Sequence, residues 1–585
     1  MRQFFKYVLA TITGIFILGL LGLVLLVGFV AALASSDKEV TVANDSVLEL
    51  KLDRPIAERE SRDSFASAFS NQADNIGLDQ LKATIRRAKD DGDIKGIFLN
   101  VELVQVGMAS LEEVRNALID FKKSGKFIVA YADAASEKSY YLTSVANRIY
   151  LNPQGTLEFN GLSSETMYYK NLFDKAGIQP QIFRVGSFKS AVEPFFRENM
   201  SDSARLQTSS FLNSINDFTL GNVAAARKIA PARLKVISDS MLVHNADDAK
   251  RLGLVTHLGY YDQALDYMKG KLGVEKDEKL SLVNLGDYSK VEDDEENSSS
   301  NRIAVVYADG DIVTGKGGND NIGSTRFAEA IRKARLDDKV KAVVLRVNSP
   351  GGSSLASDII YREVMLTKKV KPIVCSMSDV AASGGYFIAM GCDTIVAHPN
   401  TITGSIGVFG VLPNVEPLLR DKLGITTDRV TTGKFSDFPT VTRALTPFEK
   451  TQFQNEINRI YADFTTKAAQ GRHMPVERLR GYASGRVWSG SEAKARGLVD
   501  VLGSYDDALR IAARRAKLKE GDYRIQKLPR QKTFAESIFS GFSEEAKLRL
   551  VKEEMGPMYP VYQQYKKLSE MKGAQMRMPF EVNIQ

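Results

Sequence analysis

The chain has 585 residues, of which 44% are apolar and 25% are charged, and its formal net charge is +7. Such a composition is typical of a folded globular protein, and the length requires at least two domains. The small basic excess forms no dense stripe with interleaved aromatics, so we expect no nucleic-acid partner. Two cysteines and four scattered histidines give no disulfide framework and no ligand spacing, so neither a metal nor a cofactor is expected.

The N-terminal segment from Tyr7 to Ala34 is apolar and uncharged, and Arg2 and Lys6 precede it. At ~1.5 Å per residue it is long enough to cross a ~30 Å hydrocarbon layer. We therefore predict a transmembrane anchor over residues 7–34, with a cleaved signal peptide as the alternative because Ala32-Leu33-Ala34 resembles a cleavage site. The basic start predicts a cytoplasmic N-terminus and a body on the far side of the membrane.

The rest of the chain contains two related halves. Residues 249–255 (AKRLGLV) match residues 493–499 (AKARGLV), and residues 93–99 likewise match residues 339–345. An offset of about 245 residues indicates a duplicated domain and not a solenoid repeat. We predict a first domain over 45–286, an acidic and serine-rich linker over 287–301, a second domain over 302–516 and a helical extension over 517–585.

Within the second half, apolar runs that favour strands alternate with amphipathic runs that favour helices. Residues 303–307, 342–347 and 372–377 have the composition of buried strands. Alternation of this kind predicts an α/β fold in which helices flank a parallel sheet.

Two of these predicted strands end in glycine turns, at Asn348–Ser353 and at Ala382–Tyr386. A serine at a helix N-terminus, beside free backbone N–H groups, suits a nucleophile with an oxyanion pocket. The first half has Glu137 where the second half has Ser383, and Gln105-Val106 where the second half has two glycines. Only the second half can therefore supply the nucleophile, which we predict to be Ser383.

The candidate base is a lysine, because no histidine lies at a convincing distance from Ser383 in the sequence. The nearest, His398, is expected to have a strand-end or capping role. A lysine with a pKa near ~10.4 costs roughly 4.6 kcal/mol to deprotonate at pH 7, and burial reduces that cost. Lys189 lies in an apolar stretch, although Glu193 would oppose the shift if it came close.

Five motifs together resemble the signal peptide peptidase A (protease IV) family, peptidase family S49, in its long, duplicated form. They are Arg184–Phe195, Asn348–Gly352, Ala382–Tyr386, Thr401–Gly407 and Gly485–Gly490. The resemblance implies tandem ClpP/crotonase-like domains and a serine protease in the bacterial inner membrane, with its catalytic body in the periplasm. It also implies a homotetramer that degrades signal peptides and other short apolar peptides.

The resemblance also implies roles for individual residues. Ser383 would be the nucleophile, Lys189 the general base, and Ser405 the group that orients the lysine. The backbone N–H groups of Gly384 and Gly352 would form the oxyanion hole. Nucleophile and base would then come from different halves of the chain.

Three alternatives remain open at this point. Lys434 aligns within one position of Lys189 in the duplication and is an alternative base. A non-catalytic oligomeric membrane scaffold would need no reactive serine. An acyl-CoA enzyme of the crotonase superfamily would use backbone oxyanion donors without an activated serine.

Overall fold

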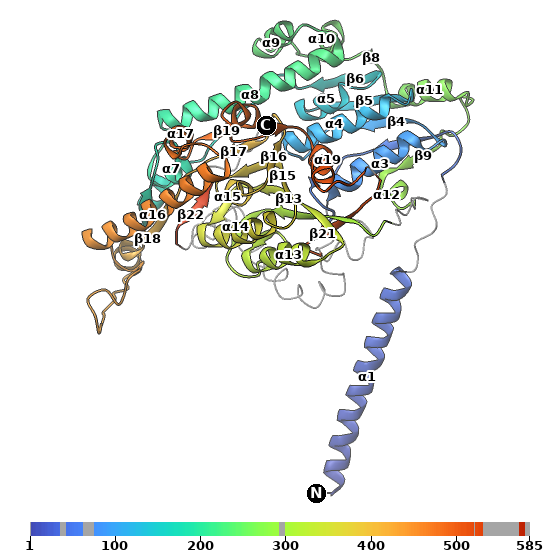
Figure 1. Ribbon diagram of the computed structural model, residues 1–585. Helices are drawn as coiled ribbons and strands as arrows, with labels where there is room; N and C mark the ends of the chain where they lie inside the picture. The colour runs from blue at the N-terminus through green and yellow to red at the C-terminus, as the bar shows by residue number, and fades with distance from the viewer. Residues whose placement is uncertain are drawn as a thin grey trace.

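The computed structural model describes residues 2–34, 42–61, 75–291, 299–519, 521–530 and 573–578. Helix α1 (Arg2–Ala34) is continuous and extends away from the rest of the chain in Figure 1. Among the described residues, no helix meets the combined length and apolarity needed to cross a membrane.

The body is a mixed α/β structure built around two parallel sheets with the same strand order. The first sheet runs β8-β6-β5-β4-β1-β9. Its strands are β1 (Ser46–Leu50), β4 (Ile94–Asn100), β5 (Phe127–Ala135), β6 (Arg148–Leu157), β8 (His257–Leu258) and β9 (Leu282–Asn284). The second sheet contains the equivalent path β20-β16-β15-β13-β10-β21. Its strands are β10 (Arg302–Asp309), β13 (Val340–Ser349), β15 (Ile373–Ala382), β16 (Thr394–Ala397), β20 (Val501–Leu502) and β21 (Arg524–Leu528), and β17 (Ile402–Gly404) and β19 (Val487–Ser489) extend it beyond β15.

Matching side-chain contacts show that the two sheets are copies of one plan. The hydroxyl of Tyr140 donates to the carbonyl of Leu254 at 2.8 Å, and the hydroxyl of Tyr386 donates to the carbonyl of Leu498 at 3.0 Å. These tyrosines and leucines are the pairs that the sequence repeat aligns. The chain is therefore a tandem duplication in three dimensions as well as in sequence.

Helices flank the two sheets (Figure 1), and equivalent helices pack together, α3 on α4 in the first repeat and α13 on α14 in the second. In α13, Phe327, Ile331 and Ala334 are buried at helical spacing, as expected for one apolar stripe on a sheet. The helices of the first repeat are α3 (Leu78–Asp90), α4 (Met108–Lys122), α5 (Glu137–Thr143), α6 (Lys170–Ala176), α7 (Glu193–Phe196), α8 (Asp202–Arg227), α9 (Pro231–Asp239), α10 (Ala246–Arg251), α11 (Tyr261–Leu272) and α12 (Leu285–Tyr288). Those of the second are α13 (Ser324–Leu336), α14 (Ser354–Lys368), α15 (Gly384–Ala389), α16 (Pro447–Gly471), α17 (Val476–Tyr482), α18 (Gly490–Ala495) and α19 (Tyr505–Arg515).

A third sheet joins the two repeats and the end of the chain. It runs β12-β11-β14-β22-β18-β7. Its strands are β7 (Gln179–Arg184), β11 (Asp311–Val313), β12 (Asn321–Gly323), β14 (Gly351–Ser353), β18 (Phe409–Asn414) and β22 (Gln575–Arg577). Since β7 belongs to the first repeat and pairs antiparallel with β18 of the second, this sheet brings the Lys189 region next to the Ser383 region.

The structure corrects the predicted end of the second domain. The sequence predicts a domain that stops at residue 516 and a helical extension over 517–585, but β21 pairs with β10 and β22 pairs with β14. The edges of β10 and β14 present backbone groups that a later segment satisfies, and Leu528 and Met576 are buried there. Residues 531–572 and 579–585 of that extension, and residues 292–298 of the predicted linker, lie outside the described residues.

Candidate active site

Ser383 stands at the junction between strand β15 and helix α15. It is the residue that precedes the helix, and its backbone has φ 54° and ψ −111°. A non-glycine residue with positive φ is uncommon and costs on the order of 1–3 kcal/mol, and such strain is concentrated at functional sites. The side chain of Ser383 is fully buried, and its backbone N–H donates to the carbonyl of Gly404 at 2.8 Å.

Lys189 reaches this serine from the first repeat. Its Nζ atom lies 2.8 Å from Ser383 Oγ, 3.0 Å from Ser405 Oγ and 3.2 Å from the Ser405 carbonyl oxygen. Close backbone approach allows this, because a β-carbon on Gly485 would lie 2.7 Å from the Lys189 α-carbon. The structure thus brings the predicted Ser383, Lys189 and Ser405 into one hydrogen-bonded group.

The environment of Lys189 favours the uncharged amine. The residue has no solvent exposure, and this burial lowers the pKa of Lys189 well below its ordinary value. The expected opposition from Glu193 does not arise at this site. Its carboxylate accepts from the N–H and the hydroxyl of Ser201, at 3.0 and 2.7 Å, at the start of α8.

Gly384, which follows Ser383 directly, lies close to the Gly351-Gly352 pair. Gly351 has φ +101°, which L side chains rarely adopt. A β-carbon there would lie 2.6 Å from the Gly384 nitrogen and 2.0 Å from the carbonyl oxygen of Met576. The absence of side chains therefore lets a carbonyl group approach the backbone of Gly384, as an oxyanion pocket requires.

Strand β22 is the segment that brings this carbonyl to the site. It pairs antiparallel with β14, with Met576 opposite Gly352, and Gln575 also pairs with Phe409 of β18. Arg577 anchors the strand through an ion pair of 2.7 Å with Asp311. The arrangement is that of a peptide added as a strand to a sheet, and nothing in the sequence pattern of this segment indicated it.

The equivalent position in the first repeat has no hydroxyl nucleophile. Glu137 begins α5, and its carboxylate accepts from the backbone N–H groups of Asn160 and Gly161 at 3.1 and 2.9 Å. Burial raises the pKa of Glu137. This carboxylate therefore stabilises the loop that contains Asn160 and Gly161.

The alternative base Lys434 lies elsewhere. It is exposed, on a turn between β18 and α16. Its ammonium lies 5.5 Å from the centre of the Phe435 ring. Within the described part of the chain, no contact of Lys434 with Ser383 or with Glu137 is present.

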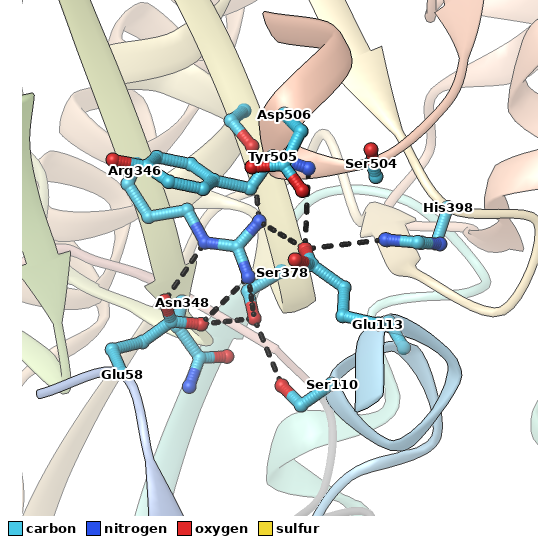
Figure 2. Close-up of polar contacts among 12 residues, drawn as sticks. Glu58, Ser110, Glu113, Arg346, Asn348, Ser378, His398, Ser504, Tyr505 and Asp506 are labelled. Atoms are coloured by element: carbon cyan, nitrogen blue, oxygen red, sulfur yellow. Dashed lines mark hydrogen bonds and ion pairs between the residues drawn. The ribbon is translucent and has the colours of Figure 1, made fainter. Parts of the chain in front are cut away.

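A buried ionic cluster, which sequence reasoning did not find, connects the two repeats (Figure 2). At its centre, Arg346 of β13 bonds the carboxylate of Glu58 at 2.8 and 3.0 Å and that of Glu113 at 3.0 Å. His398 Nε2 lies 3.2 Å from Glu113, so this histidine belongs to the cluster and not to Ser383. Only the fold could reveal the cluster, because its members are hundreds of positions apart in sequence.

Nothing in the described ranges could hold a metal ion through three or more His, Cys, Asp or Glu side chains. The side chains Cys375 and Cys392 are both buried and free.

Comparison with known proteins gives concordant matches. The family model described as peptidase family S49 matches residues 120–275 and 365–519. Protease 4 of Salmonella typhi is 39% identical over 470 residues, which cover 78% of this chain and 75% of that protein. Protease 4 of Haemophilus influenzae is 36% identical over 84% of this chain and 83% of that protein. The chloroplastic serine protease SPPA of Arabidopsis thaliana is 34% identical over 86% of this chain and 74% of that protein.

Among solved structures, a ClpP1 mutant from Listeria monocytogenes aligns at 15% identity with a TM-score of 0.24. The alignment covers 36% of this chain and 94% of that one.

Proposed function

Since this chain belongs to peptidase family S49 and is a serine peptidase, we propose that it cleaves peptides with a dyad of Ser383 and Lys189. The observation that carries the proposal is the 2.8 Å separation of Lys189 Nζ from Ser383 Oγ in a fully buried setting. A hydroxyl needs a base within hydrogen-bond reach to become a nucleophile, and an unprotonated lysine is such a base.

In the proposed reaction, Ser383 Oγ attacks the carbonyl carbon of the scissile bond while its proton moves to Lys189 Nζ. The negative charge that develops on the carbonyl oxygen is stabilised by the N–H groups of Gly384 and Gly352. The Lys189 ammonium then gives its proton to the leaving amine as the C–N bond breaks. Water, deprotonated by the same amine, attacks the ester, and the proton returns to Ser383 as the acid product leaves.

Ser405 is proposed to position the base. Its hydroxyl and its carbonyl oxygen both lie within hydrogen-bond distance of Lys189 Nζ, at 3.0 and 3.2 Å. The two N–H bonds of the neutral amine donate to these acceptors, and its single lone pair is then directed at the Ser383 hydroxyl. Ser405 itself has φ +50°, so the bend that presents both acceptors is a strained one.

The proposed substrate is a short, apolar peptide bound in an extended conformation. Support comes from β22, which lies extended between β14 and β18 with the Met576 carbonyl oxygen at the glycine pocket. A substrate strand in that place would present a backbone carbonyl to Ser383. Signal peptides left after preprotein processing have this chemistry, and we propose that they are the natural substrates.

We further propose that the protein is anchored by residues 7–34 in the bacterial inner membrane, with its body in the periplasm, and that it forms a homotetramer of ClpP/crotonase-like domains. The apolar sequence of the segment and the family membership support this location. Fractionation of cells that express the full chain, followed by protease digestion of spheroplasts, tests it. A body that stays protected inside intact spheroplasts would contradict the proposed orientation.

The test of the reaction uses the purified full-length chain and a synthetic signal peptide with a fluorophore and a quencher. The unmodified protein should cleave the peptide, and Ser383→Ala should not, although both should have the same melting temperature. If Ser383→Ala cleaved at the parent rate, the assignment would be wrong and a scaffold role would gain support. Thioester hydrolysis without peptide cleavage would favour the acyl-CoA alternative.

A further inference from the structure

A cavity of about 730 Å³, lined mainly by the first repeat and partly by residues 379–380, 400 and 402 of the second, lies where the first repeat has its equivalent of the active site. This volume is within the range of about 300–1,000 Å³ that is usual for ligand pockets. Its wall includes Gln105, Val106 and Glu137, the residues that replace the catalytic glycines and serine. The mechanism proposed above makes no use of this cavity.

The cavity corresponds to the space that β22 fills in the second repeat. There, β14 has β11 on one side, through the pair Ile312 and Gly352, and β22 on the other. In the first repeat, the N–H of Ile56, in β2 (Ile56–Ala57), donates to the Gln105 carbonyl at 2.9 Å. In this comparison β2 takes the place of β11. The backbone edge of Gln105 that faces away from β2 is therefore equivalent to the edge of β14 that pairs with β22.

The wall facing this edge is also equivalent in the two repeats. Residues 160–163 line the cavity, and Ser163 aligns with Phe409 at the start of β18. In the second repeat, β22 lies between β14 and β18. In the first repeat the cavity lies between Gln105–Gly107 and residues 160–163, the segments equivalent to those that flank β22.

The walls are held in place by side chains specific to the first repeat. Glu137 bonds the N–H groups of Asn160 and Gly161, and Lys138 Nζ donates to the carbonyl of Val106 at 3.2 Å. Within the described residues, the backbone N–H groups of Gln105 and Val106 have no recorded acceptor. Hydrogen bonds therefore hold both walls, and the edge still has N–H donors to offer to a ligand.

Asn400 in the cavity wall provides a second, independent indication of a ligand. The residue is 2% exposed, and among the described residues neither its Oδ1 nor its Nδ2 atom has a hydrogen-bond partner. A buried amide without partners is costly, and such a group in a native structure calls for an explanation. A peptide group, which has one donor and one acceptor, is the complement of this amide.

We propose that this cavity binds a short, apolar peptide as an added strand along Gln105–Gly107, with one of its peptide groups paired to Asn400, and does not cleave it. Leu103, Val104 and Leu162 in the wall are apolar and would contact the apolar side chains of such a peptide. The choice of peptide rests on the proposed function, since the ligand is of the same class as the substrate. Without a hydroxyl nucleophile at position 137, the bound peptide stays intact.

The cavity is connected to both sides of the active site. Asn400 precedes β17, which leads directly to Ser405. Asp379 lies on β15, four positions before Ser383, and its carboxylate accepts from the N–H groups of Ala109 and Ser110 at the start of α4, at 2.8 and 2.9 Å. A peptide held between these elements therefore alters the rate of cleavage in the second repeat.

The test uses the full-length Ser383→Ala chain, which holds a peptide without cleaving it. A short apolar peptide with a fluorophore and a benzophenone side chain is titrated by anisotropy, irradiated, and mapped by mass spectrometry. Cross-links are expected at residues 103–108 and 160–163. Asn400→Leu, and separately Ser163→Trp at the exposed rim, should weaken binding at this site about tenfold or more.

Asn116→Leu is the matched control, because Asn116 lines a different cavity of about 720 Å³. It should leave the cross-links unchanged. Leucine resembles asparagine in shape but needs no partners, so Asn400→Leu should keep or raise the melting temperature, whereas a purely structural role would lower it. Cross-links confined to the groove beside β14 and β18, or undiminished binding to both Asn400→Leu and Ser163→Trp, would overturn the proposal.

Coupling is measured in the chain with Ser383 intact. The cleavage rate of a reporter peptide should change with the concentration of an uncleavable peptide, and this response should be lost in Ser163→Trp. Identical responses in the two proteins would overturn the coupling. If the chain never cleaved peptides, the proposed function would be wrong. The cross-linking result would still decide whether the cavity binds the apolar peptide.

Discussion

Lys189 Nζ and Ser383 Oγ lie 2.8 Å apart, although 194 positions separate them in the chain. Each comes from a different repeat, and the pairing of β7 with β18 holds the two repeats in register at this point. In the proposed reaction, one half of the chain would supply the amine, and the other would supply the hydroxyl and the glycine turn.

Replacing Lys189 by methionine should abolish cleavage and stabilise the fold. Burial disfavours the ammonium form, so the pKa of Lys189 in the folded chain lies below its unfolded value of ~10.4. At any pH where the unfolded chain binds this proton more fully than the folded chain does, the wild-type protein is destabilised. Between the two pKa values, wild-type stability should fall by about 1.4 kcal/mol for each unit of decreasing pH. Denaturant titrations at several pH values measure the difference from Lys189→Met, which should shrink as the pH approaches ~10.4.

Lys434→Met is the control for this variant, because Lys434 is an exposed lysine on a distant turn. It should keep both activity and stability. Loss of cleavage in Lys434→Met together with retained cleavage in Lys189→Met would transfer the role of base to Lys434.

The pH profile of kcat/KM should rise with pH and reach its plateau well below ~10.4, the ordinary pKa of lysine. The base must be neutral, and burial lowers the pKa of Lys189, so activity should be lost as the pH falls through that lowered value. Steady-state kinetics over a range of buffers give the profile. A rise that is still incomplete at pH 10 would contradict an amine with a lowered pKa.

Ser405→Ala should reduce kcat by about tenfold, the equivalent of one hydrogen bond of about 1.4 kcal/mol, with little change in KM. The hydroxyl of Ser405 lies 3.0 Å from Lys189 Nζ and is proposed to orient it. Because the bond also bears on the protonation of the lysine, the pH profile of kcat/KM should shift as well. An unchanged profile and an unchanged kcat would show that Ser405 has no such role.

Disrupting the ionic cluster should lower the free energy of unfolding more than disrupting an exposed ion pair. Arg346→Met leaves the buried carboxylates of Glu58 and Glu113 without their shared guanidinium, and should cost about 3–5 kcal/mol of unfolding free energy. Arg459→Met removes the exposed pair with Glu456 and should cost no more than about 1 kcal/mol. Chemical denaturation compares the two, and equal costs would argue against a structural role for the cluster.

Removal of β22 should make the groove easier to enter. A chain that ends at residue 572 lacks the strand that pairs with Gly352. Because a tethered strand competes with substrate at an effective concentration on the order of millimolar, KM for a short peptide should fall by about tenfold in this chain, while kcat stays the same. A chain that ends after Met578 keeps β22 and serves as the control. Equal KM values in the two truncated chains would mean that β22 does not compete with substrate.

The sequence predicted the elements of the site that depend on local patterns. Internal repetition identified the duplication, and the contrast between Glu137 and Ser383 separated the copies. The motif around Lys189 was recognised only by resemblance, since no local property places it against a serine in the other repeat. Strand β22, the Arg346 cluster and the unpartnered amide of Asn400 were not predicted, because each depends on backbone edges or charges that meet only after folding.

The most direct test of the dyad is labelling of the intact protein with a serine-directed phosphonate, followed by mapping of the adduct by mass spectrometry. The account predicts an adduct on Ser383 in the wild-type chain and in Lys434→Met, and almost none in Lys189→Met. An adduct on another serine, or undiminished labelling of Ser383 in Lys189→Met, would contradict it.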